Sequence, residues 1–217
     1  MKIAVLLCGH IRTFSKTKES FKMFIASLQS VNFVDVYVST YYQQNGFHKF
    51  IQQAHGLYDN KLLTHDEIEI MLKDLDLKTL CVEDEEKVND QIKQESVNFE
   101  EGIFYHDIFA QYRKIQNLLK LIEPSEYDLI IKTRFDVVYN TYPVIETVGT
   151  YLNTDCFLDY VIISDYPTLK YIVDNVFKKG FYNCEIDKQT WSIHLLLKHV
   201  TKDLPLKNVF SVDLIRK

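Results

Sequence analysis

Apolar runs alternate with segments of helical periodicity along the first part of the chain. Residues Lys2–Cys8 form an almost continuous apolar run, which is typical of a strand buried on both faces of a sheet. Residues Ser15–Leu28 place apolar side chains three and four positions apart and predict a helix. Residues Val34–Ser39 predict a second strand. This order of strand, helix and strand favours a parallel pair in an α/β sheet.

The second part of the chain repeats this alternation. The clearest helix is predicted at His106–Ile122, where one stripe of apolar residues recurs at helical spacing. Further apolar runs predict strands at Tyr127–Lys132 and Phe157–Ser164, and further periodic segments predict helices at Pro167–Phe177 and Lys188–His199. The chain therefore has the pattern of an α/β protein.

Between residues 43 and 100 the periodic signal is less pronounced. A helix is predicted at Thr64–Leu72 and a short strand at Thr79–Val82. The run EDEEKVNDQIKQE, residues 83–95, is so acidic that we interpret it as a solvated surface segment.

The composition indicates a globular protein and argues against nucleic-acid-binding, zinc-binding and membrane-spanning proteins. A length of 217 residues with 47% hydrophobic residues suits one globular domain, and a formal charge of -5 argues against nucleic acid as the main partner. The cysteines are widely spaced without a C-x-x-C pair, which argues against a zinc site and favours a reducing, cytoplasmic location. The apolar run at Lys2–Cys8 is too short to span a membrane, so we expect no transmembrane segment.

Polar residues follow the first predicted strand, at the end where parallel α/β sheets bind ligands. They include Gly9, His10, Arg12 and Thr13. The glycine lets the backbone turn sharply near a ligand, and the arginine is suited to pairing with a diphosphate. The segment matches neither a Walker loop nor a G-x-G-x-x-G fingerprint. A polar turn with a surface arginine explains it equally well.

Two further strand ends carry candidate side chains. Thr40 and Tyr41 follow the second strand, where a hydroxyl and a ring could hold a base or ribose, although tyrosines at a sheet edge often only pack. Arg134 and Asp136 follow the strand at Tyr127–Lys132. Asp136 could supply oxygen to Mg²⁺ or Mn²⁺, and Arg134 could neutralise a phosphate or orient the aspartate. The alternative is an Arg–Asp pair on the surface.

Three segments taken together resemble a family of small GT-A-type glycosyltransferases, found in bacterial surface-polysaccharide clusters and in large viruses of algae and protists. The segments are KIAVLLCGHIRTF (2–14), DVYVSTY (35–41) and YDLIIKTRFDVVY (127–139). The resemblance implies a GT-A-like fold with a mixed, mostly parallel central sheet flanked by helices. It also implies one domain over residues 1–217, in which residues 1–140 bind the nucleotide sugar and residues 141–217 form the acceptor side.

Such enzymes transfer a sugar from a nucleotide-diphosphate sugar to a hydroxyl of a glycan or glycoprotein acceptor, and they hold the diphosphate through a metal bound by Asp-x-Asp. The matching position reads Arg134-Phe135-Asp136, so Asp136 is the one remaining ligand for Mn²⁺ or Mg²⁺, and the arginine could partly replace the cation. The resemblance also implies nucleotide contacts at Gly9, His10, Arg12, Thr13, Thr40 and Tyr41, with Arg134 beside the diphosphate.

An inverting glycosyltransferase needs a carboxylate as general base on the acceptor hydroxyl. Candidates in the second half are Asp159, Asp165, Glu185 and Asp187. Glu185 is the first choice because it stands in a loop before a predicted helix, where an acceptor can reach it, and Asp159 is the second. Asp165 is expected to cap the following helix.

Two other functions agree with the sequence. The incomplete metal motif suits a nucleotide-sugar-binding protein without transfer activity. A sugar nucleotidyltransferase is disfavoured, because the first strand is not followed by a glycine-rich loop that carries a lysine. In each case we expect a cytoplasmic protein, or one of the host cytoplasm if the chain is viral.

Overall fold

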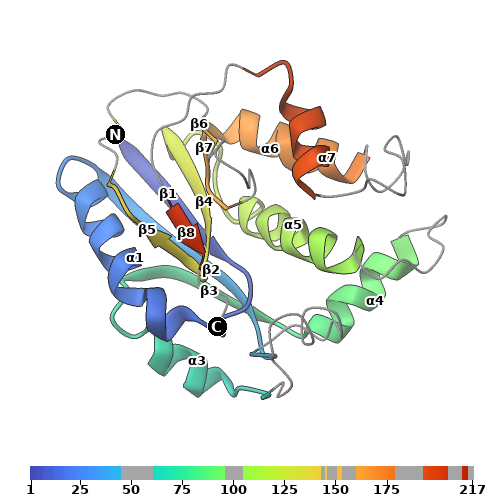
Figure 1. Cartoon of the computed structure of the whole chain (residues 1–217), viewed down its shortest axis with the longest axis horizontal. Coiled ribbons are helices and arrows are strands. Elements are labelled where there is room, and N and C mark those ends of the chain that lie inside the picture. The colour runs from blue at the N-terminus through green and yellow to red at the C-terminus, as the bar shows by residue number, and fades with distance from the viewer. Residues whose placement is uncertain are drawn as a thin grey trace.

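The structure is a computed structural model, and it describes residues 1–44, 61–95, 105–142, 145, 151–152, 160–178, 193–204 and 212–214. Within these residues a twisted sheet lies between helices on its two faces (Figure 1). This agrees with the α/β class expected from the alternating pattern. No helix in the described part of the chain is both long and apolar enough to cross a membrane.

The central sheet is mixed and mostly parallel. Its six strands, in spatial order, are β3 (Leu77–Glu83), β2 (Phe33–Tyr41), β1 (Lys2–Cys8), β4 (Leu129–Arg134), β7 (Ile162–Ser164) and β6 (Tyr151–Leu152). Strand β1 pairs in parallel with β2 and β4, and β2 pairs in parallel with β3. Strands β7 and β6 add to the β4 side in antiparallel fashion. The predicted mixed, mostly parallel sheet is therefore confirmed.

A second, two-stranded sheet follows directly from β4. It consists of β5 (Val137–Tyr139) paired antiparallel with β8 (Val212–Leu214), close to the end of the chain. Only two residues, Phe135 and Asp136, separate β4 from β5, so the chain turns abruptly after β4. That turn contains Asp136.

Helices cover both faces of the central sheet. On one face α1 (Phe14–Gln29) and α3 (His65–Leu72) pack over the odd-numbered side chains of β1. On the other face lie α5 (Tyr105–Leu119) and α6 (Tyr166–Asn175), with α7 (Ile193–Thr201) against α6 and α4 (Glu85–Glu95) against α5 (Figure 1). The alternation of β1 side chains between two buried layers explains why its sequence is apolar throughout.

Most of the acidic run is a helix, and one face of this helix is buried. Residues Glu85–Glu95 form α4, and its apolar residues Val88 and Ile92 are buried against the layer formed by α5. The two apolar residues stand four positions apart and therefore share one face of the helix. The prediction of a solvated surface segment agrees with the exposed residues of this helix, and it is wrong for the face that carries Val88 and Ile92.

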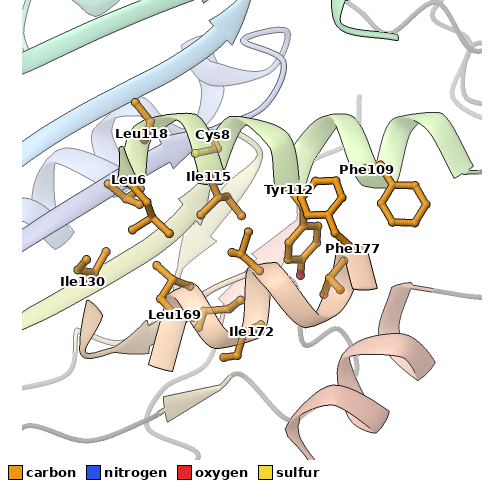
Figure 2. Packing of buried hydrophobic residues seen from close by; sticks show 14 of the residues in the cluster. Leu6, Cys8, Phe109, Tyr112, Ile115, Leu118, Ile130, Leu169, Ile172 and Phe177 are labelled. Carbon is orange, nitrogen blue, oxygen red and sulfur yellow. The ribbon is translucent and has the colours of Figure 1, made fainter. Parts of the chain in front are cut away.

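The layer between the sheet and α5–α6 is a close-packed apolar core. Figure 2 shows Leu6 and Ile130 of the sheet facing Ile115 of α5 and Leu169 of α6. Cys8 lies in the same layer, and burial raises the pKa of its thiol to about 12. Cys8 is thus a small buried side chain, as its apolar surroundings in the sequence indicate.

Candidate active site

The ends of β1, β2 and β4 meet at one edge of the sheet. The register places Cys8, the last residue of β1, opposite Arg134, the last residue of β4. Gly9 follows with a φ of +125°, a backbone conformation that favours glycine, and its N–H donates a hydrogen bond of 3.1 Å to the carbonyl of Ser39 in β2. The loop after β1 is therefore held between the ends of its two neighbours.

Two arginines from this edge surround one carboxylate. Arg134 donates from Nε to Oδ1 of Asp136 at 2.8 Å and from Nη2 to Oδ2 at 2.7 Å, which is a two-pronged contact. Arg12 Nη2, from the loop after β1, lies 3.7 Å from the same Oδ2 atom. We call Arg12, Asp136 and Arg134 the arginine–aspartate triad. The three side chains of the triad together carry one net positive charge.

The charge of Asp136 depends on these arginines. Only 4% of this residue is exposed, so the carboxylate is buried rather than part of an Arg–Asp pair on the surface. Burial alone would raise the pKa of the Asp136 carboxyl, but the Arg134 and Arg12 guanidiniums outweigh burial and hold that pKa below its usual value. The side chain is therefore an ionised carboxylate that the protein itself neutralises.

These contacts do not fit a divalent cation. Mg²⁺ and Mn²⁺ prefer several oxygen ligands, whereas both oxygens of Asp136 accept hydrogen bonds from Arg134 and one lies beside Arg12. Among the residues that the structure describes, no group of three or more His, Cys, Asp or Glu side chains could hold a metal ion. The metal role of Asp136 stays a prediction, and the surroundings of the carboxylate count against it.

The first turn of α1 is fixed beside the triad. Thr17 donates a short hydrogen bond to the carbonyl of Phe135, and the Phe14 and Phe135 rings meet edge to face with centroids 5.2 Å apart. Thr13 directly precedes the helix, is almost fully buried, and its hydroxyl has no hydrogen-bond partner within the described part of the chain. The N-terminal end of a helix carries partial positive charge, so this end adds to the field of the triad.

An aromatic ring supports the other side of Arg134. The guanidinium carbon of Arg134 lies 5.3 Å from the ring centroid of Tyr160, in the geometry of a cation–π contact. Tyr160 is buried and lies just before β7. Asp136 and Tyr160 together therefore fix the plane of the guanidinium.

His10 is oriented by a buried carboxylate. Its Nε2 lies 3.1 Å from Oε1 of Glu85, and its ring centroid is 4.8 Å from that of Tyr41. Glu85 is 1% exposed, and its backbone N–H donates to Gln43 Oε1 at 3.0 Å. The first turn of α4 thus supports the loop after β1, a role that its acidic sequence did not reveal.

A buried lysine of α5 holds the end of β2. Lys114 of α5 donates from Nζ to the carbonyl of Thr40 at 2.9 Å and to Oε2 of Glu83 at 3.0 Å, and it lies 3.2 Å from the centroid of the Tyr41 ring. Burial lowers the pKa of Lys114 to about 8, although Glu83 opposes this shift. Thr40 and Tyr41 are themselves buried, so their side chains are not exposed at the end of β2.

The structure brings most of the predicted site residues to one edge of the sheet. Gly9, His10, Arg12, Thr13, Thr40, Tyr41, Arg134 and Asp136 all lie at or just beyond the ends of β1, β2 and β4. Asp165 caps α6 as expected, by accepting a hydrogen bond of 2.8 Å from the backbone N–H of Thr168. Glu185, Asp187 and Asp159 lie outside the described residues.

Sequence reasoning missed Lys114 and Glu85. Lys114 stands four residues after Ala110 and four before Leu118, both buried, so its position on the apolar side of α5 was a usable signal. Glu85 stands three residues before the buried Val88, and the same periodicity places it on the inner face of α4. In both cases the charge of the residue concealed its helical position.

No family model matches the chain, and no curated protein matches it. Among solved structures, the chain is similar to mouse xyloside xylosyltransferase 1 in its apo form, at 8% identity over 96% of this chain and 85% of that chain, with a TM-score of 0.46. It is similar to a mutant of Drosophila β-1,4-galactosyltransferase 7 in complex with manganese, UDP-Gal and xylobiose, at 10% identity over 95% and 64% of the two chains, with a TM-score of 0.43. It is also similar to an active-site mutant of LgtC, at 10% identity over 96% and 72%, with a TM-score of 0.47. At such low identities and TM-scores these similarities establish no activity, substrate or cofactor for this chain.

Replacing Asp136 by asparagine should destabilise the protein at neutral pH. The Asp136→Asn change leaves two partly buried guanidiniums without their carboxylate, and we expect the free energy of unfolding at pH 7 to fall by about 2–4 kcal/mol. Because the pKa of Asp136 is lower in the folded chain than the usual 3.8, its stabilisation is present above that value and disappears as the pH falls through the folded pKa. The difference in unfolding free energy between the native chain and the variant should therefore become smaller at acidic pH.

Urea unfolding at pH 7 and at several acidic values measures this difference. Asp174→Asn is the matched control, since Asp174 forms an exposed ion pair with Lys170 on α6 and its loss should cost less than about 1 kcal/mol. Equal stability of the two variants at pH 7 would show that the triad does not stabilise the fold.

Lys114 should make stability depend on alkaline pH. Its pKa is about 8 in the folded chain and near 10.5 when unfolded, so the folded state binds this proton less tightly. Relative to a Lys114→Met variant, the native chain should gain about 3 kcal/mol of unfolding free energy as the pH rises from about 8 to 10.5. Urea unfolding over this pH range measures the gain, with the exposed Lys120→Met as control. A difference between native and Lys114→Met chains that is independent of pH would contradict the assignment.

Proposed function

We propose that the protein is a glycosyltransferase that moves a sugar from a nucleotide-diphosphate sugar to a hydroxyl of a glycan or glycoprotein acceptor. The observation that carries the proposal is the arginine–aspartate triad at the carboxyl ends of neighbouring parallel strands, where open α/β sheets bind ligands. Guanidinium groups form planar, two-pronged contacts with phosphate, and the triad carries a net positive charge. A diphosphate is the ligand that this arrangement suits best.

In the proposed reaction the bond between the sugar C1 and the diphosphate oxygen breaks, and a bond between C1 and the acceptor oxygen forms. The acceptor hydroxyl gives its proton to a carboxylate base, and the nucleoside diphosphate leaves with the electron pair of the broken bond. Arg12 and Arg134 would stabilise the charge that develops on the leaving diphosphate. Their positions are fixed before the reaction by Asp136 and Tyr160, so little reorganisation is needed.

The remaining roles are proposals from the chain order. We assign the base to Glu185, with Asp159 as second choice, and the acceptor side to residues 141–217, with residues 1–140 holding the nucleotide sugar. Gly9, His10 and Thr13 would contact the nucleotide, while Thr40 and Tyr41 would support that surface from within, because both are buried. The resemblance suggests Mn²⁺ or Mg²⁺ at Asp136, but no step of this proposal depends on a metal.

A nucleotide-sugar-binding protein without transfer activity is the second candidate. The observation that favours it is the arginine at the first position of the Arg134-Phe135-Asp136 motif, where the resembling enzymes carry a metal ligand. Such a protein would bind the donor and leave it intact.

Incubation of the purified chain with UDP- and GDP-sugars, with release of free nucleoside diphosphate as readout, tests the proposal. A glycosyltransferase without its acceptor is expected to hydrolyse its donor slowly. Tight binding without release would support the second candidate instead. Conversion of a sugar 1-phosphate and nucleoside triphosphate into a nucleotide sugar would identify a nucleotidyltransferase, and the absence of both binding and turnover would contradict the whole proposal.

The assignment of the base predicts a selective loss of turnover. Glu185→Gln keeps the shape and hydrogen-bonding capacity of the side chain but removes its proton affinity, so transfer to an acceptor should fall by roughly 10²–10⁴-fold while donor binding is retained. Rates of product formation and calorimetric donor affinities separate the two effects. If Asp159→Asn abolishes transfer and Glu185→Gln does not, the base is Asp159.

A further inference from the structure

We infer that Arg12 and Arg134 take the place of a divalent cation, so that this protein binds the diphosphate of its nucleotide without a metal ion. The inference rests on the proposed function, because it concerns the same site, and it goes further by stating that no divalent cation takes part in binding the diphosphate. It is carried by the contacts of Asp136, the one carboxylate in the position of a metal motif.

The carboxylate of Asp136 is fully committed within the protein. Arg134 donates one hydrogen bond to each carboxylate oxygen, of 2.8 Å to Oδ1 and 2.7 Å to Oδ2. Arg12 Nη2 lies 3.7 Å from Oδ2. A divalent cation on this carboxylate would compete with the Arg134 guanidinium for its oxygens and would lie next to two positive charges. Among the residues that the structure describes, no group of three or more His, Cys, Asp or Glu side chains could complete such a site.

Two guanidiniums can supply what a cation supplies in such a site. Each carries five N–H donors in a fixed plane, and Arg134 directs two of these at Asp136. The Nη2 atoms of Arg12 and Arg134 both lie within 3.7 Å of the same Asp136 oxygen, although they come from different strand ends. A diphosphate that contacts one arginine is therefore within reach of the other.

Asp136 then acts as a positioning residue. It holds the guanidinium of Arg134 against the ring of Tyr160 and draws Arg12 toward the same point. Its negative charge also offsets one of the two positive charges, which reduces the repulsion between Arg12 and Arg134 before the ligand binds. The start of α1, which follows Arg12 and Thr13 directly in the chain, adds partial positive charge close to the triad.

The experiment compares nucleotide binding with and without divalent metal. UDP and GDP are each titrated into the purified chain by calorimetry, once with excess EDTA and once with excess Mn²⁺ or Mg²⁺. We expect the nucleotide that binds to have dissociation constants that agree within about threefold between these conditions, since no metal couples to its binding. This readout needs neither an acceptor nor turnover.

Arginine variants test whether Arg12 and Arg134 are responsible for nucleotide binding in the absence of metal. Arg12→Ala and Arg134→Ala should each weaken binding in EDTA by roughly 10- to 100-fold, the loss expected for a charged hydrogen bond. Arg134→Lys keeps the charge but not the planar fork, so it should restore only part of this loss. Lys170→Ala, which removes an exposed cation on α6, is the control and should bind like the native chain.

Asp136→Asn separates the two kinds of site most sharply. A metal ligand at this position predicts that Mn²⁺ strengthens binding to the native chain and that the change abolishes this effect, whereas the arginine site predicts no effect of Mn²⁺ on either chain. If this variant does not fold, the comparison of EDTA with Mn²⁺ on the native chain still decides the question.

Each outcome bears on a different claim. Binding that requires Mn²⁺ or Mg²⁺ would overturn the inference and leave the proposed glycosyltransferase standing. Binding that is independent of metal but unaffected by Arg12→Ala and Arg134→Ala would also overturn it, since other groups would then hold the diphosphate. Binding of neither nucleotide under any condition would overturn the proposed function, and the inference with it.

Discussion

A buried negative charge requires a positive partner, and in this protein that constraint governs the functional edge of the sheet. Asp136 lies in the turn between β4 and β5, where the chain passes beneath the first turn of α1. An ionised carboxylate in that position is tolerated only because Arg134 and Arg12 neutralise it. The same pairing fixes both guanidiniums and joins the loop after β1 to the end of β4. The protein thus uses one carboxylate to place two cations.

A second buried ion supports the neighbouring strand. Lys114 reaches from α5 to the carbonyl of Thr40 and to Glu83, which joins α5 to the ends of β2 and β3. Tyr41 lies between this lysine and His10, and Glu85 holds His10 from α4. The loop after β1 is therefore supported on one side by the triad and on the other by a chain of aromatic and charged contacts. Both supports converge on the segment that begins at Gly9.

The sequence predicted the fold better than the contacts of the site. Strands β1 and β2 were readable because strands buried on both faces need long apolar runs, and α5 was readable because its apolar stripe has helical spacing. Helix α4 was missed because charged residues outnumber the two apolar ones that anchor it. Arg134 and Asp136 were found from their place after a strand. Whether Asp136 faces a metal or an arginine depends on the distance to Arg12, which lies more than a hundred positions away along the chain, and residue types alone do not give that distance.

The pairing of β1 with β4 has a consequence for how the protein is made. Ile3 lies opposite Leu129, and the backbone N–H of Lys2 donates to a side-chain oxygen of Asp128, a contact across 126 positions of the sequence. Contacts of such long range form slowly, and a chain emerging from the ribosome cannot close this pair until β4 has been synthesised. Until then β1, which is apolar on both faces, can pair in the sheet with β2 but not with β4. Since Arg12 and Arg134 come from opposite sides of this late pairing, the anion-binding edge cannot be complete in any intermediate in which β1 and β4 are still apart.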